Sequence, residues 1–145
     1  RVSFTLDIRK FAEKAAANTN DVIAGTCLDL SRRIILRTPV DTGQARWNWQ
    51  ASISNPATGT LNGNDKSGAK RINEVSVTSV NAPSNIFFLT NNMPYINKLE
   101  YGGYPSPSYT GKTASGYSTQ APSGMVRVTI REFNSIVDKQ AAEVK

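Results

Sequence analysis

Three short segments punctuate this chain with proline, glycine and asparagine, and they limit the folds that it can adopt. They span residues 37–43, 89–102 and 120–125, and we call them the first, second and third junctions. Proline ends helices and glycine permits turns that other residues resist, so each junction marks a place where one element gives way to the next. Distinctive residues at junctions, with no reactive group among them, are more typical of a structural subunit than of an enzyme. The junction residues are Pro39, Asp41, Gly43, Asn92, Pro94, Tyr95, Glu100, Gly102, Pro122 and Gly124.

A long helix is expected before the first junction. Apolar residues recur at spacings of three, four and seven between Asp7 and Arg37, which is the pattern of one face of an amphipathic helix. Cys27 lies on that face and is expected to be buried there as a small hydrophobic residue. Pro39 ends the helix, because its ring keeps the preceding residue out of the helical conformation. Residues 41–43 then form a turn.

The segment after this turn is expected to be a β-strand over residues 45–54. Trp47 and Trp49 then share one face of the strand, since side chains alternate with a period of two. Two tryptophans on one face require burial, either in the core under the long helix or against a neighbouring subunit. The sequence leaves both possibilities open.

The middle of the chain predicts a helix, a strand and a second helix, all short. Residues 69–80 are ambiguous, because their β-branched residues favour a strand while the spacing of their apolar residues also allows a helix. We expect the helix, on the strength of the resemblance described below. Residues 86–90 form a short apolar strand. Pro94 then starts a helix that ends at Gly102.

Long polar loops separate these elements. The segments 55–68 and 102–120 are too rich in small and polar residues to build a core. We expect 55–68 and 104–119 to be mobile in the isolated chain and to become ordered against partners. The last element is an amphipathic helix over residues 125–143, with Ser123 as the candidate N-cap.

Composition argues against catalysis and metal binding. The 145 residues suit a single domain and contain no histidine and one cysteine, so the usual ligands of transition metals are missing. Asp41 is interpreted as a turn residue and Glu100 as the partner of an arginine, in place of roles in acid–base chemistry. We therefore expect no enzyme activity and no cofactor. No run of residues is long and apolar enough to predict a membrane span.

The chain carries a net charge of +6, and the excess is spread along it. A basic balance can indicate a nucleic acid, an acidic partner or a soluble surface. Aromatic and basic residues do not interleave here in the patterns of known nucleic-acid-binding motifs. A basic nucleic-acid-binding module is nevertheless the alternative from a different functional class.

Taken in order, the three junctions resemble the tail-component family of long-tailed bacteriophages, whose members serve as tail-completion or head–tail joining proteins of the neck. The resemblance rests on TPVDTG at 38–43 followed by Arg46 and Trp49, on TNNMPY at 90–95 followed by LEYG at 99–102, and on APSGMV at 121–126. It implies an α+β fold in which a long N-terminal helix and a C-terminal helix pack on a small β-sheet. One tail-completion or neck-type domain would span residues 1–145.

The same resemblance implies a virion structural protein that assembles in the host cytoplasm into a homo-oligomeric ring, commonly a hexamer. Such a ring lies at the head–tail junction, between a head-completion or connector protein and the tail terminator or tail tube protein. DNA passes through its lumen without specific binding. A tail terminator that caps the tail tube is the alternative within the same class.

Aromatic and basic side chains are expected to make the subunit contacts. A lumen that passes DNA must not bind its phosphate groups tightly, so most of the positive charge is expected on the outer or axial faces of the ring. There, helix-borne arginines would meet acidic groups of neighbouring subunits. The candidate interface residues are Arg32, Arg33, Trp47, Trp49, Tyr104, Tyr109, Tyr117, Arg127 and Arg131.

Overall fold

The computed structural model describes residues 19–103, 113 and 116–143. Its helices and one small antiparallel sheet give the α+β class that the sequence predicts. The expected helix start near Asp7 and the candidate interface residues Tyr104 and Tyr109 lie outside the described residues.

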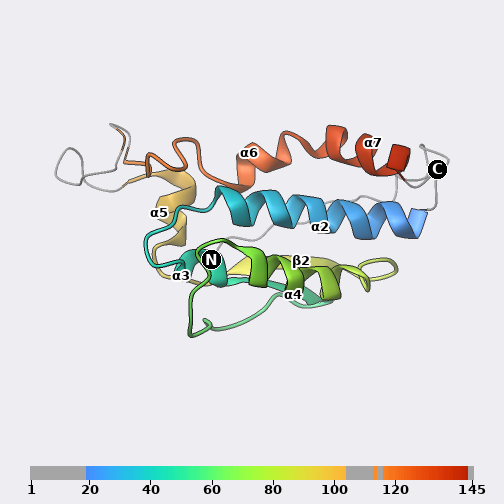
Figure 1. Ribbon diagram of the computed structural model, residues 1–145, viewed down its shortest axis with the longest axis horizontal. Coiled ribbons are helices and arrows are strands. Elements are labelled where there is room, and N and C mark those ends of the chain that lie inside the picture. The colour runs from blue at the N-terminus through green and yellow to red at the C-terminus, as the bar shows by residue number, and fades with distance from the viewer. Residues whose placement is uncertain (1–18, 104–112, 114–115, 144–145) are drawn as a thin grey trace.

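Helix α2 (Thr19–Arg37) runs along the middle of the described structure (Figure 1). Its buried side chains recur with helical spacing and include the expected Cys27. Helices α6 (Val126–Ile130) and α7 (Phe133–Glu143) lie along one side of α2, whereas the sheet and helix α4 (Ala69–Ser79) lie on the other side. The long helix is therefore packed on both sides, and it ends at Arg37, the first residue of the first junction, two residues before Pro39 as predicted.

The sheet consists of β1 (Trp49–Ile53) and β2 (Phe87–Asn91), which pair antiparallel with Trp49 opposite Asn91. Helix α4 stands between the two strands in the sequence. The ambiguous segment 69–80 is therefore a helix, α4, as expected. The short apolar strand expected after it is confirmed as β2.

The strand after the first junction is shorter than predicted, and the prediction that it begins at residue 45 was wrong. Residues Gln44–Trp47 form a single helical turn, α3, and Asn48 separates this turn from β1. Gly43 adopts a φ of +91°, and the backbone N–H groups of Trp47 and Asn48 donate to carbonyls one turn earlier. Trp47 and Trp49 consequently do not share a strand face.

The C-terminal helical pattern is divided into α6 and α7, in contrast to the single helix expected over residues 125–143. At the break, the N–H of Glu132 donates to the carbonyl of Thr129, three residues earlier instead of four. The carboxylate of Glu132 also accepts hydrogen bonds from Arg37 at the end of α2. The break in the helix therefore coincides with a contact to the long helix.

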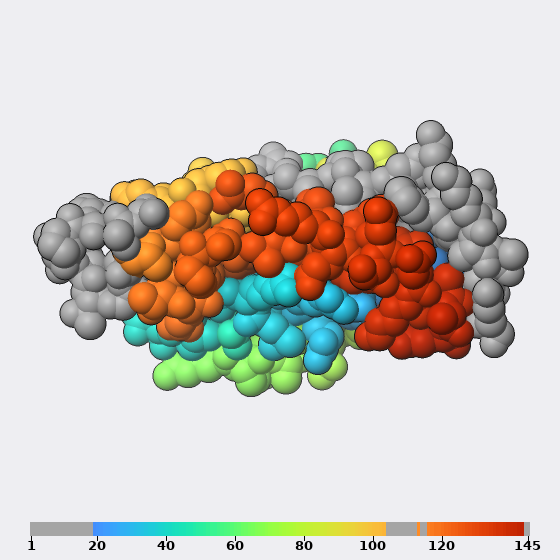
Figure 2. Space-filling model, turned by 90° about the horizontal axis from the view of Figure 1, so that it is seen from above, coloured from blue at the N-terminus to red at the C-terminus, as the bar shows by residue number. Residues whose placement is uncertain are grey.

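Helix α5 (Ile96–Tyr101) follows Pro94 and ends at Gly102, which has a φ of +78°, as the sequence predicts. The larger core cluster joins residues of α2, both strands, α5 and the start of α6. Its fully buried members are Ile34, Ile35, Trp49, Val75, Leu89, Ile96 and Met125. Seen from above, α6 and α7 extend over α2 along the molecule (Figure 2).

Candidate functional site

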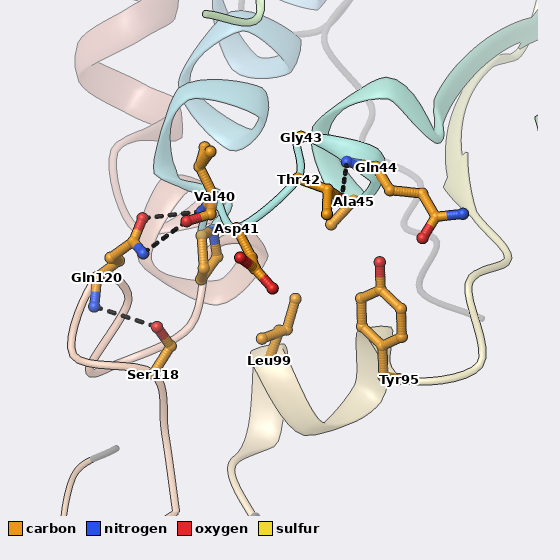
Figure 3. A pocket seen from close by; sticks show the side chains of 11 residues that line it. Val40, Asp41, Thr42, Gly43, Gln44, Ala45, Tyr95, Leu99, Ser118 and Gln120 are labelled. Carbon is orange, nitrogen blue, oxygen red and sulfur yellow. Dashed lines mark hydrogen bonds between the residues drawn. The ribbon is translucent and has the colours of Figure 1, made fainter. Parts of the chain in front are cut away.

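The three junctions meet at one end of the described structure, next to α3 and α5 (Figure 1), and Figure 3 shows the residues around the hollow there. Residues from all three line one hollow: the segment 39–43 from the first junction, Tyr95 and Leu99 from the second, and Gln120 from the third. The fold thus brings together segments that lie up to 80 positions apart in the chain. We call the three junctions and the residues that bond them together the junction cluster, and it is the candidate functional site.

Gln120 fastens the third junction to the first. Its side-chain nitrogen donates to the carbonyl oxygen of Val40 at 2.9 Å, and the N–H of Val40 donates to Oε1 of Gln120 at 2.8 Å (Figure 3). Two opposed hydrogen bonds fix both the distance and the relative orientation of the two segments. Sequence reasoning placed Gln120 in the third junction but missed its bonds to Val40, because this partner lies 80 positions away in the chain.

Glu100 connects the second junction to the third through hydrogen bonds. Its side chain is fully buried, and its Oε1 accepts hydrogen bonds from the N–H groups of Met125 at 2.9 Å and Val126 at 2.7 Å. Its Oε2 accepts from the N–H of Arg127 at 3.2 Å. These groups belong to the start of α6, where helical N–H groups lack internal partners and a carboxylate is favoured. Glu100 thus takes the capping role that was wrongly assigned to Ser123.

The guanidinium of Arg127 completes the surroundings of Glu100. Its Nε donates to Oε2 of Glu100 at 2.8 Å, and its Nη2 donates to the backbone carbonyl of Glu100 and to the hydroxyl of Tyr117. The same guanidinium lies over the ring of Tyr101, 4.5 Å from its centre. The hydrogen bond to Glu100 is the largest cause that raises the pKa of Arg127 above its ordinary value. The predicted arginine partner of Glu100 therefore comes from the same chain.

Two junction residues must be glycine for two independent reasons. Gly43 and Gly124 have φ values of +91° and +84°, in the left-handed region that other residues resist. A Cβ atom on Gly43 would also lie 2.7 Å from the backbone nitrogen of Lys66, and one on Gly124 would lie 2.5 Å from the carbonyl oxygen of Glu100. The two glycines therefore set how closely neighbouring segments approach one another.

Arg46 and Thr38 close the C-terminal end of α2. The guanidinium of Arg46 donates to the carbonyls of Leu36 at 2.8 Å and Thr38 at 2.9 Å, which suits the unpaired carbonyls of a helix end. The hydroxyl of Thr38 accepts a hydrogen bond from Nε1 of Trp49 at 2.8 Å, and both side chains are buried. Trp49 therefore belongs to the core, which was one of the two possibilities left open by the sequence.

Two asparagines tie the second junction to its surroundings. The buried Asn91 donates from Nδ2 to the carbonyl of Ala45 at 3.0 Å. Asn92 donates from Nδ2 to the carbonyls of Ala57 and Gly59 at 3.0 and 2.9 Å. The long loop after β1, which we expected to be mobile in the isolated chain, is therefore bonded to the second junction.

The hollow inside the junction cluster has a volume of about 330 Å³. Apolar side chains, among them Val40 and Leu99, form part of its lining. Among the described residues that line it, Asp41 carries a charge, and its carboxylate is directed into the open space (Figure 3). The turn at Asp41 is closed by Thr42, whose hydroxyl accepts a hydrogen bond from the N–H of Gln44 at 3.2 Å.

Two of the arginines that we assigned to subunit contacts find carboxylates within the chain. Nε of Arg33 lies 2.9 Å from Oδ1 of Asp29, and Arg127 pairs with Glu100 as described. For these two residues the chain itself supplies a carboxylate, and a further contact with an acidic group of a neighbouring subunit stays a prediction. Arg32 and Arg131 are exposed, and their contact with a neighbour stays a prediction.

Glu132 links the break between α6 and α7 to the end of α2. Its carboxylate accepts hydrogen bonds from Arg37 and lies 3.3 Å from Nη1 of Arg33. The hydrogen bond from Arg37 is the largest cause that lowers the pKa of Glu132 below its ordinary value. This ion pair is one third exposed, so water and salt weaken it.

Trp47 lies half-buried beside α4. The guanidinium of Arg71 is 4.0 Å from the centre of its ring, and its Nε1 donates to the carbonyl of Asn62 at 3.0 Å. Burial lowers the pKa of Arg71, and the backbone N–H of the same residue donates to the carboxylate of Asp65 at 2.9 Å. Trp47 and Tyr117 each keep part of their surface exposed, so both remain candidate interface residues.

Three further features concern the acidic, thiol and apolar groups of the described residues. Among them, no three His, Cys, Asp or Glu side chains are arranged to hold a metal ion. Burial raises the pKa of the Cys27 thiol to about 12, so this residue stays protonated near neutral pH and is a poor nucleophile. No helix in the described part of the chain has the length and apolar character needed to cross a bilayer.

Comparison of the chain with protein-family models, with curated proteins and with solved structures gives no match. A functional proposal therefore rests on the fold, on the junction cluster and on the resemblance of the junctions.

Proposed function

We propose that this chain is a virion structural protein that forms a ring at the head–tail junction of a long-tailed bacteriophage. The observation that carries the proposal is the junction cluster. The residues on which the resemblance to the tail-component family rests come from three distant segments, and some of them bond directly to one another: Glu100 accepts from the N–H groups of Met125 and Val126, and Trp49 donates to Thr38. Segments that are hydrogen-bonded to one another in this way are suited to a rigid structural subunit.

Exposed apolar side chains on α4 support a protein–protein contact. Val77 and Val80 are one helical turn apart and 71 % and 70 % exposed, and Ile86, just before β2, is 53 % exposed. Val77 also lines a groove of about 340 Å³, together with Ala51 of β1 and Val75 of α4. Neighbouring apolar side chains exposed on a protein surface often mark an interface. In the proposed ring, this face contacts a neighbouring copy.

The distribution of charge favours a structural role over a nucleic-acid-binding module. Several of the described arginines form ion pairs with carboxylates of the same chain, and these cations are less available to phosphate groups than unpaired ones. The paired arginines are Arg33, Arg37, Arg71 and Arg127.

Native mass spectrometry and negative-stain electron microscopy of the purified chain test the proposed self-assembly. We expect closed rings, with a hexamer as the main species, to appear as the protein concentration rises. Val77→Asp should abolish the rings, since it places a charge in the exposed apolar face. Ala142→Asp, on the exposed side of α7, should leave them intact.

Fluorescence anisotropy with a short DNA duplex tests the alternative function. A nucleic-acid-binding module predicts tight binding at low salt that weakens steeply as salt is added. A chain that stays monomeric at every concentration and binds duplex DNA in this way would contradict the proposed ring and favour the module.

A further inference from the structure

The loop between β1 and α4 carries the one Asn-Gly pair of the sequence, Asn62 and Gly63. Both residues are exposed, and neither belongs to a helix or a strand. Glycine has no Cβ atom, so another group can approach its backbone nitrogen closely. In an Asn-Gly pair, that nitrogen can attack the carbonyl carbon of the asparagine side chain. The pair therefore places an electrophile and an unshielded nucleophile next to each other at the surface.

The two reacting groups are not held by other parts of the described chain. The side-chain amide of Asn62 and the backbone N–H of Gly63 make no hydrogen bond with a described residue. Other asparagine amides are held, since Nδ2 of Asn48, Asn91 and Asn92 each donates to a backbone carbonyl. Gly63 has a φ of +123°, which glycine adopts without strain. The amide of Asn62 is thus open to attack in a way that those other amides are not.

The backbone of this pair forms part of the surroundings of Trp47. Nε1 of Trp47 donates to the backbone carbonyl of Asn62 at 3.0 Å. A Cβ atom on Gly63 would lie 3.0 Å from the same Nε1, so the backbone of Gly63 packs closely against the indole. The guanidinium of Arg71 lies 4.0 Å from the centre of the ring. A change in the backbone at positions 62 and 63 therefore acts directly on Trp47, one of the candidate interface residues.

We infer that Asn62 is a site of spontaneous deamidation, which converts it to aspartate and isoaspartate and changes the contacts of Trp47. The backbone nitrogen of Gly63 forms a bond to Cγ of Asn62, and the bond from Cγ to Nδ2 breaks. Nδ2 leaves as ammonia with the proton that the Gly63 nitrogen gives up, and a cyclic succinimide remains. Water then opens the succinimide at one of its two carbonyl groups.

The carbonyl that water attacks decides the product. Attack at the former side-chain carbonyl gives aspartate, whereas attack at the main-chain carbonyl gives isoaspartate. In isoaspartate the main chain runs through the former side chain, so the link to Gly63 is longer by one carbon atom and the former main-chain carbonyl becomes a carboxylate. Both contacts of the pair with Trp47 are then altered. This inference goes beyond the proposed ring and does not depend on it, because the reaction needs water alone.

Mass spectrometry of the aged full chain tests the site. The purified protein is kept in mildly alkaline buffer, which favours loss of the proton from the Gly63 nitrogen, and both products are quantified in digests taken at successive times. We expect the peptide that contains Asn62 to gain deamidated forms, with isoaspartate among them. Asn134 is the matched control, because it is also exposed but precedes Ser135 within α7. Deamidation no faster at Asn62 than at Asn134 would overturn the inference.

The variant Asn62→Gln gives a second test. Its longer side chain cannot form the succinimide, so the modification at this position should be lost. In NMR spectra of the ageing natural chain, the indole N–H signal of Trp47, assigned through its contacts with Gly63, should fade and reappear at a new position. The signal of Trp49, which donates to the buried Thr38, should stay in place. A Trp47 signal that stays unchanged while isoaspartate accumulates, or that shifts equally in Asn62→Gln, would overturn the inference as well.

Discussion

Glycine at position 43 decides the path of the chain through the first junction. Gly43 has a φ of +91°, and the backbone nitrogen of Lys66 lies 2.7 Å from the place that a Cβ atom would take. Both effects disfavour any other residue at this position. Gly59 offers a matched comparison, because it has a φ of +75° but nothing within 4 Å of the place that a Cβ atom would take.

Gly43→Ala should therefore destabilise the protein more than Gly59→Ala. The conformational cost of a left-handed residue, about 1–2 kcal/mol, applies to both variants. The close contact adds about 1–3 kcal/mol to Gly43→Ala alone. Urea denaturation measures both free energies of unfolding, and equal values would show that Lys66 and its neighbours make room for the methyl group.

Glu100 is the residue on which the second and third junctions depend most. Glu100→Gln keeps the shape of the side chain but removes the charge that accepts four hydrogen bonds, three of them from the backbone of α6. We expect a loss of about 2–3 kcal/mol in the free energy of unfolding, because bonds to a charged, buried acceptor are strong. Glu143→Gln, at the exposed end of α7, is the control. A loss no larger than that of the control would contradict the capping role.

At the scale of single residues, the sequence predicts the roles of residues that act on their own backbone. It does not predict the roles of residues whose partners are distant in the chain. Pro39 and Gly43 act on the conformation of their own backbone, so their roles could be predicted from the residue type at each position. Arg46 and Gln120 act on carbonyls and amides that the fold brings to them, and no spacing rule identifies such partners. Glu100 was recognised as the partner of an arginine, but its bonds to the start of α6 required the structure.

Among the elements, long periodic helices were easier to predict than short segments. Helix α2 ends where Pro39 requires, and α4 and β2 appear where expected. The single turn of α3 was missed because four residues are too few to show a period, and alternation of Trp47 and Trp49 suggested a strand. The break between α6 and α7 was missed because a contact with Arg37, distant in sequence, accompanies it.

The loop after β1 gives a prediction about local stability. Asn92→Ala removes both hydrogen bonds to the carbonyls of Ala57 and Gly59. Amide hydrogen exchange should accelerate in residues 57–61 and stay unchanged in α2, because only the local opening equilibrium is altered. Asn97→Ala, on the exposed face of α5, is the matched control. Unchanged exchange in the loop would mean that other contacts hold it.

The ion pair between α2 and the α6–α7 break gives a prediction about pH. The unfolded chain titrates Glu132 near pH 4.3, whereas the folded pKa is lower because of Arg37. The stabilisation is therefore fully present above the unfolded pKa and is lost as the pH falls through the folded pKa. Partial exposure limits it to about 0.5–1 kcal/mol.

Glu132→Gln should thus be less stable than the natural chain at pH 7, and the two free energies of unfolding should converge as the pH falls through the folded pKa of Glu132. Denaturation at a series of pH values measures the difference, with Glu143→Gln as the control for an exposed carboxylate. A difference that stays constant with pH would show that packing, and not charge, is what Glu132 contributes.

At the scale of the whole molecule, the described chain offers two kinds of surface. One end carries the junction cluster, whose hollow is lined by all three junctions. The outer face of α4 carries the exposed Val77 beside a groove, and the exposed Val80 directly follows this helix. A ring subunit needs contacts to its neighbours in the ring and further contacts above or below, and separate surfaces of different chemistry suit these two tasks.

Inactivation of the gene in the phage, followed by electron microscopy of the lysate, tests the proposed role most directly. The proposal predicts full heads beside unattached tails of normal length, with joined particles restored when the chain is supplied from a plasmid. Overlong tails would instead indicate a tail terminator. Joined, infectious particles formed without this protein would contradict a role at the head–tail junction.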